Sequence, residues 1–301
     1  MKMNVLPADM NRLDLSFEFF PPKTDAGWRG ISKTAAAFKP FDPEFCSVTY
    51  GAGGSTQTGT LDAVLKVQEA SGAPGAAHLT VAGQSRADVD AAARTFLENG
   101  ITRIVALRGD SQEEGPYAPH PDGYGNAAEL VAGLKKIHDF DISVAAYPEK
   151  HPDSPTPEAD IDNLKAKLDA GANRAITQFF FDADSFLRYR DLLAARGIYK
   201  PVIPGVLPIR DIEQVQRFAA NCEAVVPPMV VSAYDGLDDM ESRRKRSVDL
   251  AHELCAKLVR HGVRSFHFYT LNKSDLTVEI CKRLAGTAKA EAANTVAAAT
   301  R

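Results

Sequence analysis

Residues 85–110, SRADVDAAARTFLENGITRIVALRGD, contain one complete helix-to-strand unit of the chain. Ser85 followed three residues later by Asp88 is a helix N-terminal capping sequence. Apolar residues then recur at three- and four-residue spacing, which predicts one apolar helix face, at Val89, Ala92, Ala93, Phe96 and Leu97. Gly100 stands where this pattern stops, since glycine accepts the left-handed backbone that ends a helix. The β-rich run 101–107 follows at once, so the segment predicts a helix that leads directly into a strand.

The same alternation of helix patterns and β-rich runs continues along the chain. The eight β-rich runs are nearly continuous apolar segments, as in parallel strands covered on both faces, and they span residues 13–20, 45–50, 76–81, 101–107, 141–147, 174–181, 201–207 and 264–271. A second apolar helix face is predicted by Ala127, Leu130, Val131, Leu134 and Ile137. Further glycines at helix-to-strand junctions are Gly72, Gly171, Gly197 and Gly262.

Eight strands that alternate with helices are compatible with an open doubly wound sheet or with a closed barrel. No G-x-G-x-x-G follows the first run and no G-x-x-x-x-G-K-[ST] occurs, which argues against dinucleotide-binding and P-loop folds. The count of eight favours the α/β class and a single (β/α)₈ TIM barrel, with an extra helix over 240–260 before strand eight. We expect a catalytic barrel over residues 1–286 and, in the Ala-rich residues 287–301, a frayed helix or disordered tail.

Composition points to a small-molecule partner. The 301 residues are 45% hydrophobic and 25% charged, which is typical of a soluble globular protein with a large core. A formal net charge of −4 gives no attraction to nucleic acid or to an anionic membrane, and neither partner is expected. The basic run at 243–246 is nearly neutralised by acidic neighbours and predicts a solvated helix face; these neighbours are Asp238, Asp239, Glu241 and Asp249.

The expected compartment is the cytoplasm. The cysteines are far apart and form no C-x-x-C pair, which favours a reducing environment; they are Cys46, Cys222, Cys255 and Cys281. No run approaches the roughly 18 apolar residues needed to cross a bilayer. The first 15 residues lack the apolar core of a signal peptide.

Active sites of such barrels lie at the C-terminal ends of the strands, so polar residues there are the first candidates. Glu18 ends the first run within three phenylalanines, and we expect this setting to desolvate the carboxylate and favour its protonated form, as a general acid requires. Alternatively, Glu18 could be buried in an ion pair with a neighbouring arginine or lysine. The second run ends at Thr49 and continues into the Gly-rich loop 50–55, whose backbone could approach an anion or a flat ring, or could simply form a tight turn.

The other strand ends offer further candidates. His78 lies in the third run, where it could contact a ligand or simply pack in the core. Arg108 and Asp110 end the fourth run, and they could bind a phosphate and a heterocycle edge or pair with each other. Gln178 ends the sixth run with an amide that can donate and accept. The fifth run ends at Tyr147 and leads to His151, and the next helix presents one polar face, also compatible with simple solvent exposure, at Asp160, Asn163 and Lys167.

The sequence lacks the residue patterns that several kinds of catalysis require. No H-E-x-x-H occurs and the seven histidines are dispersed, so no metal site is predicted. No G-x-S-x-G nucleophile elbow is present, and no lysine lies inside a β-rich run to form a Schiff base. A carboxylic acid, an aspartate, a glutamine, aromatic rings and Gly-rich backbone remain. These groups suit the binding of large planar heterocycles and the transfer of a hydride and a proton.

At these same strand ends the chain resembles the methylenetetrahydrofolate reductase family. The matching segments run in order through the whole barrel: FEFFPPK (17–23), SVTYGAGGST (47–56), HLT (78–80), IVALRGD (104–110), ISVAAYPEKHP (142–152), AGANRAITQFFFD (170–182), IPGVLPI (203–209), DGLDD (235–239) and FHFYTLN (266–272). The resemblance implies a (β/α)₈ barrel that binds FAD and reduces methylenetetrahydrofolate with NADH or NADPH, the two substrates using one face in turn. It also implies a homo-oligomer.

The resemblance also assigns roles to residues. Glu18 would protonate the bridging nitrogen of the folate, and Asp110 would stabilise the resulting cation. Gln178, Gln214 and Phe218 would contact the substrates. The FAD contacts would be Thr49, His78, Arg108, Gly109, Asp110, Ala127, Tyr147, His151, Asp160, Asn163 and Lys167.

Two positions depart from the family pattern, and other functions remain open. Ala166 stands where a basic flavin contact is common, and Lys273 stands where an arginine often contacts the folate; an ammonium cannot offer the planar fork of a guanidinium. A proline-dehydrogenase-like flavin barrel, a folate-binding methyltransferase barrel and a non-catalytic pterin-binding barrel are the alternatives.

Overall fold

The computed structural model describes residues 12–50, 57–110 and 117–299, with side chains up to residue 293 in the last helix. Its eight strands form one closed barrel in sequence order, and every neighbouring pair is parallel, including β1 with β8. The strands are β1 (Asp14–Phe19), β2 (Phe45–Val48), β3 (Gly75–Thr80), β4 (Arg103–Leu107), β5 (Asp141–Ala146), β6 (Arg174–Phe179), β7 (Val202–Val206) and β8 (Ser265–Tyr269). The predicted TIM barrel is confirmed, and each strand coincides with one predicted β-rich run.

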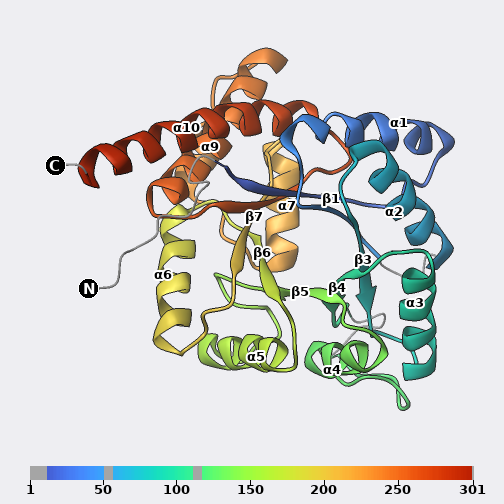
Figure 1. Cartoon of the computed structure of the whole chain (residues 1–301). Coiled ribbons are helices and arrows are strands. Elements are labelled where there is room, and N and C mark those ends of the chain that lie inside the picture. Colours follow the sequence, from blue (N-terminus) through green and yellow to red (C-terminus); the bar gives the residue numbers. More distant parts are fainter. Residues whose placement is uncertain (1–11, 51–56, 111–116, 300–301) are drawn as a thin grey trace.

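Helices surround the barrel (Figure 1). They are α1 (Asp25–Ala36), α2 (Gln57–Ser71), α3 (Arg86–Glu98), α4 (Ala127–Ile137), α5 (Pro157–Asp169), α6 (Ala183–Ala195), α7 (Ile212–Cys222), α8 (Pro228–Ser232), α9 (Met240–Arg260) and α10 (Asp275–Ala299), with a 3-10 turn η1 at Lys39–Phe41. The predicted extra helix before strand eight is α9. Helix α10 continues through the Ala-rich segment. None of the described helices combines the length and apolar character that a membrane span requires.

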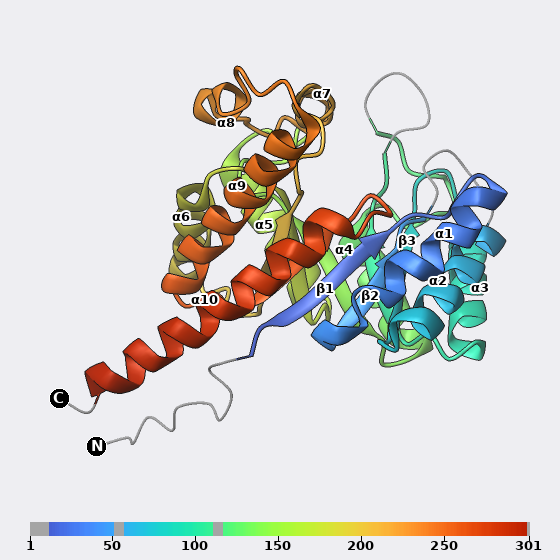
Figure 2. The ribbon, with the colours of Figure 1, turned by 90° about the horizontal axis from the view of Figure 1, so that it is seen from above.

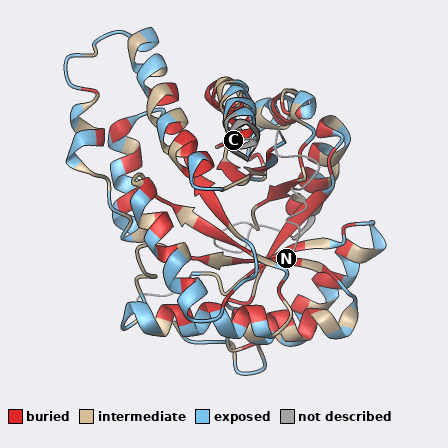
Figure 3. Cartoon of the chain, turned by 60° about the vertical axis from the view of Figure 1, so that its left-hand side comes forward, coloured by how far each residue is buried: buried red, intermediate tan, exposed pale blue. Residues whose placement is uncertain are grey.

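Local sequence signals set the helix boundaries as predicted. The Ser85 hydroxyl accepts a hydrogen bond from the Asp88 N–H at the start of α3. All five glycines predicted at helix ends have a left-handed backbone, with φ between 71° and 122°. The apolar helix faces are buried against the strands, and the opposite faces are exposed (Figure 3). Helices α7 and α8 lie together at one end of the molecule (Figure 2).

Alternation along the strands separates two layers of the core. Phe17 stacks on Phe38 with ring centroids 4.0 Å apart and on Phe268 at 5.9 Å, all in the layer between strands and helices. Ser16 and His267 point to the barrel interior instead, where the Ser16 hydroxyl lies 2.7 Å from His267 Nδ1. The β1 and β8 side chains next to the phenylalanines therefore face the inside of the barrel.

A cluster of four charged residues lies at the N-terminal ends of the strands. Arg174 contacts Asp141 at 2.8 Å and Glu44 at 3.4 Å, and Arg103 contacts the same two carboxylates at 3.2 and 3.3 Å. Both guanidinium groups lie over the ring of buried Phe45, which stacks on His267. This cluster and Phe45 lie at the end of the barrel opposite the strand C-termini.

The cluster gives a stability prediction. Arg174→Ala should lower the free energy of unfolding by about 2 kcal/mol, because Arg174 is only 16% exposed and two carboxylates would lose a partner. The control is Arg188→Ala, whose side chain is 70% exposed beside Asp182 and should contribute less than about 0.5 kcal/mol. Urea denaturation followed by circular dichroism measures both variants. Equal destabilisation would contradict the prediction.

Candidate active site

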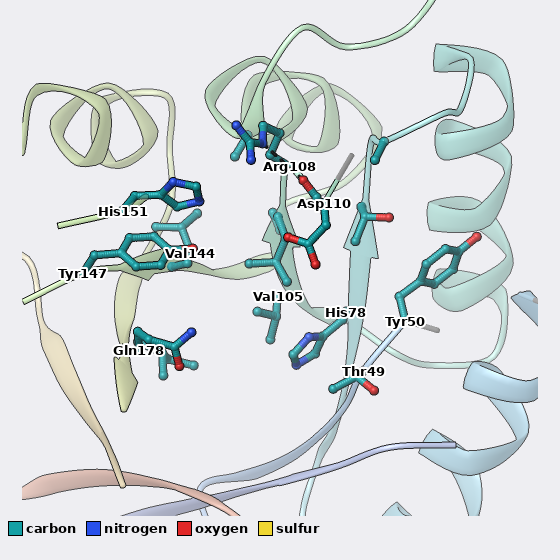
Figure 4. Close-up of a pocket in the computed structure, with 18 of the residues that line it drawn as sticks. Thr49, Tyr50, His78, Val105, Arg108, Asp110, Val144, Tyr147, His151 and Gln178 are labelled. Atoms are coloured by element: carbon teal, nitrogen blue, oxygen red, sulfur yellow. Dashed lines mark hydrogen bonds between the residues drawn. The ribbon is translucent and has the colours of Figure 1, made fainter. Parts of the chain in front are cut away.

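A cavity of about 1600 Å³ opens at the C-terminal ends of the strands. This volume exceeds the roughly 300–1,000 Å³ of a site for one drug-sized ligand, so the cavity has room for more than one. Thirteen residues predicted from the sequence line it: Glu18, Thr49, His78, Arg108, Gly109, Asp110, Ala127, Tyr147, His151, Asn163, Lys167, Gln178 and Phe218. Figure 4 shows Tyr147 and His151 on one side and Asp110 and His78 on the other.

Three predicted site residues do not line this cavity. Asp160 is buried behind its wall, where it accepts a hydrogen bond of 2.9 Å from the hydroxyl of Ser154. Gln214 is half-buried on α7, and Lys273 is exposed after β8. Ala166, the position without the expected basic group, is exposed on α5. The Gly-rich segment 51–55 lies outside the described residues.

The environment of Glu18 differs from the one its neighbours in sequence suggest. The flanking Phe17 and Phe19 pack against Phe38 outside the barrel and do not enclose the carboxyl, because adjacent strand residues face opposite sides. Glu18 Oε2 instead lies 3.4 Å from His78 Nε2 and 3.7 Å from His267 Nε2, and the side chain is 20% exposed. The expected shelter by phenylalanine rings is therefore wrong, and two imidazoles take its place.

The contact between Glu18 and His78 is not an ion pair at neutral pH. Burial lowers the pKa of His78 to about 4; Glu18 opposes this shift and His267 adds to it. The imidazole is therefore neutral at pH 7. Its Nε2 is buried and has no hydrogen-bond partner among the described residues. A neutral, unpaired ring nitrogen beside a carboxyl can hydrogen-bond to a ligand or to the protonated acid.

The lining residues that are absent from the sequence-based candidates include His267 and Tyr269. Tyr269 donates a 2.6 Å hydrogen bond to the Thr177 carbonyl. A Cβ on Gly205 would stand 2.6 Å from the Tyr269 ring, so only glycine allows β7 to pass this close. The signal was available in the sequence, since polar His267 and Tyr269 alternate with Phe266 and Phe268 at the period of a strand.

One side of the cavity carries two cations. Arg108 donates a 2.6 Å hydrogen bond to Asp153 and lies over the Tyr117 ring, so among the described residues it forms its ion pair with Asp153 and not with the neighbouring Asp110. The Lys167 ammonium donates to the Ala145 carbonyl at 2.7 Å. Burial lowers the pKa of Lys167 to about 8, with Asp160 opposing and Arg108 adding to the shift. Both cations can bind an anionic group.

The loop after β5 presents donors to the cavity. His151 packs edge-on against Tyr147 with ring centroids 4.6 Å apart. The Asp153 N–H donates to His151 Nδ1 at 3.0 Å, so in the neutral ring the proton is on Nε2, which can donate. Burial first, and then Arg108, lowers the pKa of His151, so the neutral form is favoured.

Gln178 and Gly109 shape the remaining walls. The Gln178 side-chain carbonyl accepts a 3.0 Å hydrogen bond from the Phe179 N–H, which leaves its amide nitrogen as the group that can donate to a ligand. Gly109 has a left-handed backbone, with φ +84°, and a Cβ there would meet Ala82 and Thr80 at 3.0 and 3.1 Å. Within the described ranges no three His, Cys, Asp or Glu side chains gather as metal ligands.

Comparison with known proteins identifies the family. The sequence profile described as "Methylenetetrahydrofolate reductase" matches residues 3–285. The chain is 45% identical over 278 residues to the 5,10-methylenetetrahydrofolate reductase of Pectobacterium carotovorum subsp. carotovorum, covering 91% of this chain and 90% of that protein. It is 41% identical over 274 residues to the enzyme of the same name from Escherichia coli (strain K12), covering 91% of each chain.

Among solved structures, the fold is similar to that of an uncharacterized protein from Clostridium thermocellum that binds two copies of 5-methyl-5,6,7,8-tetrahydrofolic acid. The TM-score is 0.63 at 13% sequence identity, over 91% of this chain and 94% of that one, so this likeness concerns the fold alone. The family follows from the sequence matches over nine-tenths of the chain. On those matches, the chain belongs to the methylenetetrahydrofolate reductase family.

Proposed function

We propose that the protein reduces 5,10-methylenetetrahydrofolate to 5-methyltetrahydrofolate with electrons from NADH or NADPH by way of FAD. The observation that carries the proposal is the Glu18 carboxyl, which faces the interior end of a cavity large enough for two planar ring systems. The names of the relatives support the substrate.

The residues of the cavity fit a flavin dinucleotide. Arg108 and Lys167 offer positive charge to a diphosphate, and His151 offers a donor beside them. His78 has a buried, unpaired ring nitrogen on the opposite wall. Thr49, Gly109, Ala127 and Asn163 would complete the contacts, and Asp160 would act from behind the wall through Ser154. A bound flavin supplies a carrier that takes a hydride from one substrate and gives it to the other.

Glu18 supplies the proton in this proposal. Opening the five-membered ring of the folate requires protonation of a weakly basic nitrogen, and the product is an electrophilic iminium cation. The neutral His78 ring lies 3.4 Å from the Glu18 carboxyl, so Glu18 and His78 do not form an ion pair at neutral pH. Figure 4 shows Asp110 on the same side of the cavity as His78, where its carboxylate would stabilise the cation and bind the pterin edge.

The substrate-facing wall would consist of Gln178 and Phe218. The free amide nitrogen of Gln178 would donate to the pterin, and the Phe218 ring would stack on the nicotinamide and the folate in turn. Gln214 and Lys273, which lie outside the cavity lining, would need to move or to contact only the tail of a substrate.

Affinity for FAD should depend on pH through Lys167. Below pH 8 the ammonium is charged and attracts the diphosphate; as pH rises through the pKa of about 8 it loses its proton, and affinity falls. We expect the dissociation constant to rise about tenfold per pH unit above 8, because binding then requires proton uptake. Titration of flavin fluorescence between pH 6.5 and 9.5 measures this. Lys167→Met should bind weakly at every pH; an unchanged slope in that variant would exclude Lys167 as the titrating group.

The absorbance spectrum of the purified protein tests the proposed function. We expect a flavin spectrum that bleaches anaerobically with NADH or NADPH and returns on addition of methylenetetrahydrofolate. A yellow protein that ignores folates would favour a proline-dehydrogenase-like oxidoreductase. A colourless protein that needs a corrinoid or thiol partner would favour a methyltransferase, and pterin binding without nicotinamide oxidation would favour a binding protein.

A further inference from the structure

Two charged residues of the β5–α5 loop, Glu149 and Lys150, do not line the cavity although their neighbours do. Tyr147 precedes them and His151 follows, and both of these face the cavity. The cavity contacts described above therefore leave Glu149 and Lys150 without a role. They contact instead the backbone of their own loop and the residues at the C-terminal end of α7.

Lys150 closes the loop on itself. Its ammonium donates hydrogen bonds to three backbone carbonyls, those of His151 at 2.8 Å, Pro152 at 3.2 Å and Ser154 at 2.9 Å. Its backbone is left-handed, with φ +78°, a conformation that residues with a Cβ rarely adopt. The three bonds hold the backbone of the segment that presents His151, Asp153 and Ser154 to the cavity.

Glu149 connects the same loop to the residues that follow α7. Its Oε2 accepts a 2.9 Å hydrogen bond from the Val225 N–H, 76 residues away in sequence. Beside it, Lys150 Nζ lies 3.9 Å from Glu223 Oε2, and Glu223 caps the C-terminal end of α7. Burial raises the pKa of the Glu149 carboxyl, the Val225 N–H opposes this, and Asp182 adds to it. Helix α7 in turn carries Phe218, which lines the cavity.

We propose that Glu149 and Lys150 are a positioning pair that couples the cofactor-facing loop to the substrate-facing helix α7. Lys150 sets the shape of the loop, and Glu149 holds the end of α7 against that loop. A displacement of either wall is thereby transmitted to the other. The inference rests on the proposed function for the identity of the two ligands. The contacts of Glu149 and Lys150 that carry it are independent of that function.

Glu149→Ala removes the acceptor for the Val225 N–H and tests the connection. We expect the KM for methylenetetrahydrofolate to rise about tenfold with kcat within threefold of the wild type, because Phe218 loses its fixed position. Glu149→Gln keeps an acceptor oxygen and should restore the KM to within twofold. Glu279→Ala removes a carboxylate from an ion pair on α10 and should leave both constants unchanged. A KM that Glu149→Ala leaves within twofold of the wild type would overturn the proposal.

A double-mutant cycle separates positioning from general loosening of the structure. If Glu149 acts through α7, adding Glu149→Ala to Phe218→Ala should raise the KM less than twofold further, because the positioned ring is already gone. Full additivity of the two effects would show that Glu149 acts by another route and would contradict the coupling.

Lys150→Gly removes the three hydrogen bonds of the loop without adding backbone strain, since glycine suits the left-handed backbone. The dissociation constant for FAD should rise about tenfold while the thermal midpoint of the apoprotein changes little. This variant keeps the proposal testable where Glu149→Ala does not fold, and unchanged FAD affinity would overturn it. The wild type, assayed alongside, distinguishes failure of the proposed function from failure of the positioning pair. A wild type without folate reduction contradicts the proposed function, whereas an active wild type with normal variants contradicts only the positioning pair.

Discussion

Glu18→Gln should abolish folate reduction while leaving the first half of the reaction intact. The amide occupies the same place beside His78 and His267 but cannot donate a proton as an acid does, so turnover of methylenetetrahydrofolate should fall by about 10³-fold or more. The protein should still bind FAD and oxidise NADH with an artificial electron acceptor. Stopped-flow absorbance of the two half-reactions measures each separately.

Glu18→Asp is the matched variant for this experiment. It keeps the acid but draws it back by one methylene, so we expect an intermediate loss of about 10²-fold. Folate reduction by Glu18→Gln at more than about a tenth of the wild-type rate would exclude Glu18 as the proton donor. Loss of both half-reactions together would instead indicate that the variant no longer binds the cofactor.

Asp110→Ala should produce the second large effect. Removing the carboxylate removes the negative charge that would oppose the iminium cation, and loss of one such group typically costs about 10²–10³-fold in rate. The oxidation of NADH should change less than about threefold, because no cation develops on the folate in that step. Asp110→Asn keeps the shape and a hydrogen-bonding oxygen and should lie between the wild type and Asp110→Ala. Equal loss in both half-reactions would contradict the assigned role and favour a purely structural one.

The barrel could be predicted from sequence because its parallel strands are covered on both faces. Each such strand is a nearly continuous apolar run, and the glycines at helix ends separate the runs clearly. Helix α8 was not predicted, since five residues that begin with a proline and follow another show no helical periodicity. The packing of the Ala-rich residues of α10 could not be predicted either, because alanine favours a helix without indicating what the helix packs against.

The candidate site was predictable where a polar residue interrupts an apolar strand, and less so where chain segments meet. Glu18 does line the cavity, but its phenylalanine neighbours were assigned to the wrong side, although alternation along a strand places them outside the barrel. Arg108 pairs with Asp153, which is 45 positions away in a loop, and no sequence pattern predicts this contact. The contacts of Glu149 and Lys150 belong to the same class.

The position of the cavity at the C-terminal ends of the strands limits how reactants can reach it. The cavity opens at the strand C-termini, whereas Phe45 and the cluster of Arg103, Arg174, Glu44 and Asp141 lie at the opposite end of the barrel. If the two substrates bind to the same wall in turn, as proposed, each product must leave through this opening before the next substrate can bind. An excess of either reactant should therefore slow turnover by competing with the other, which steady-state inhibition patterns would reveal.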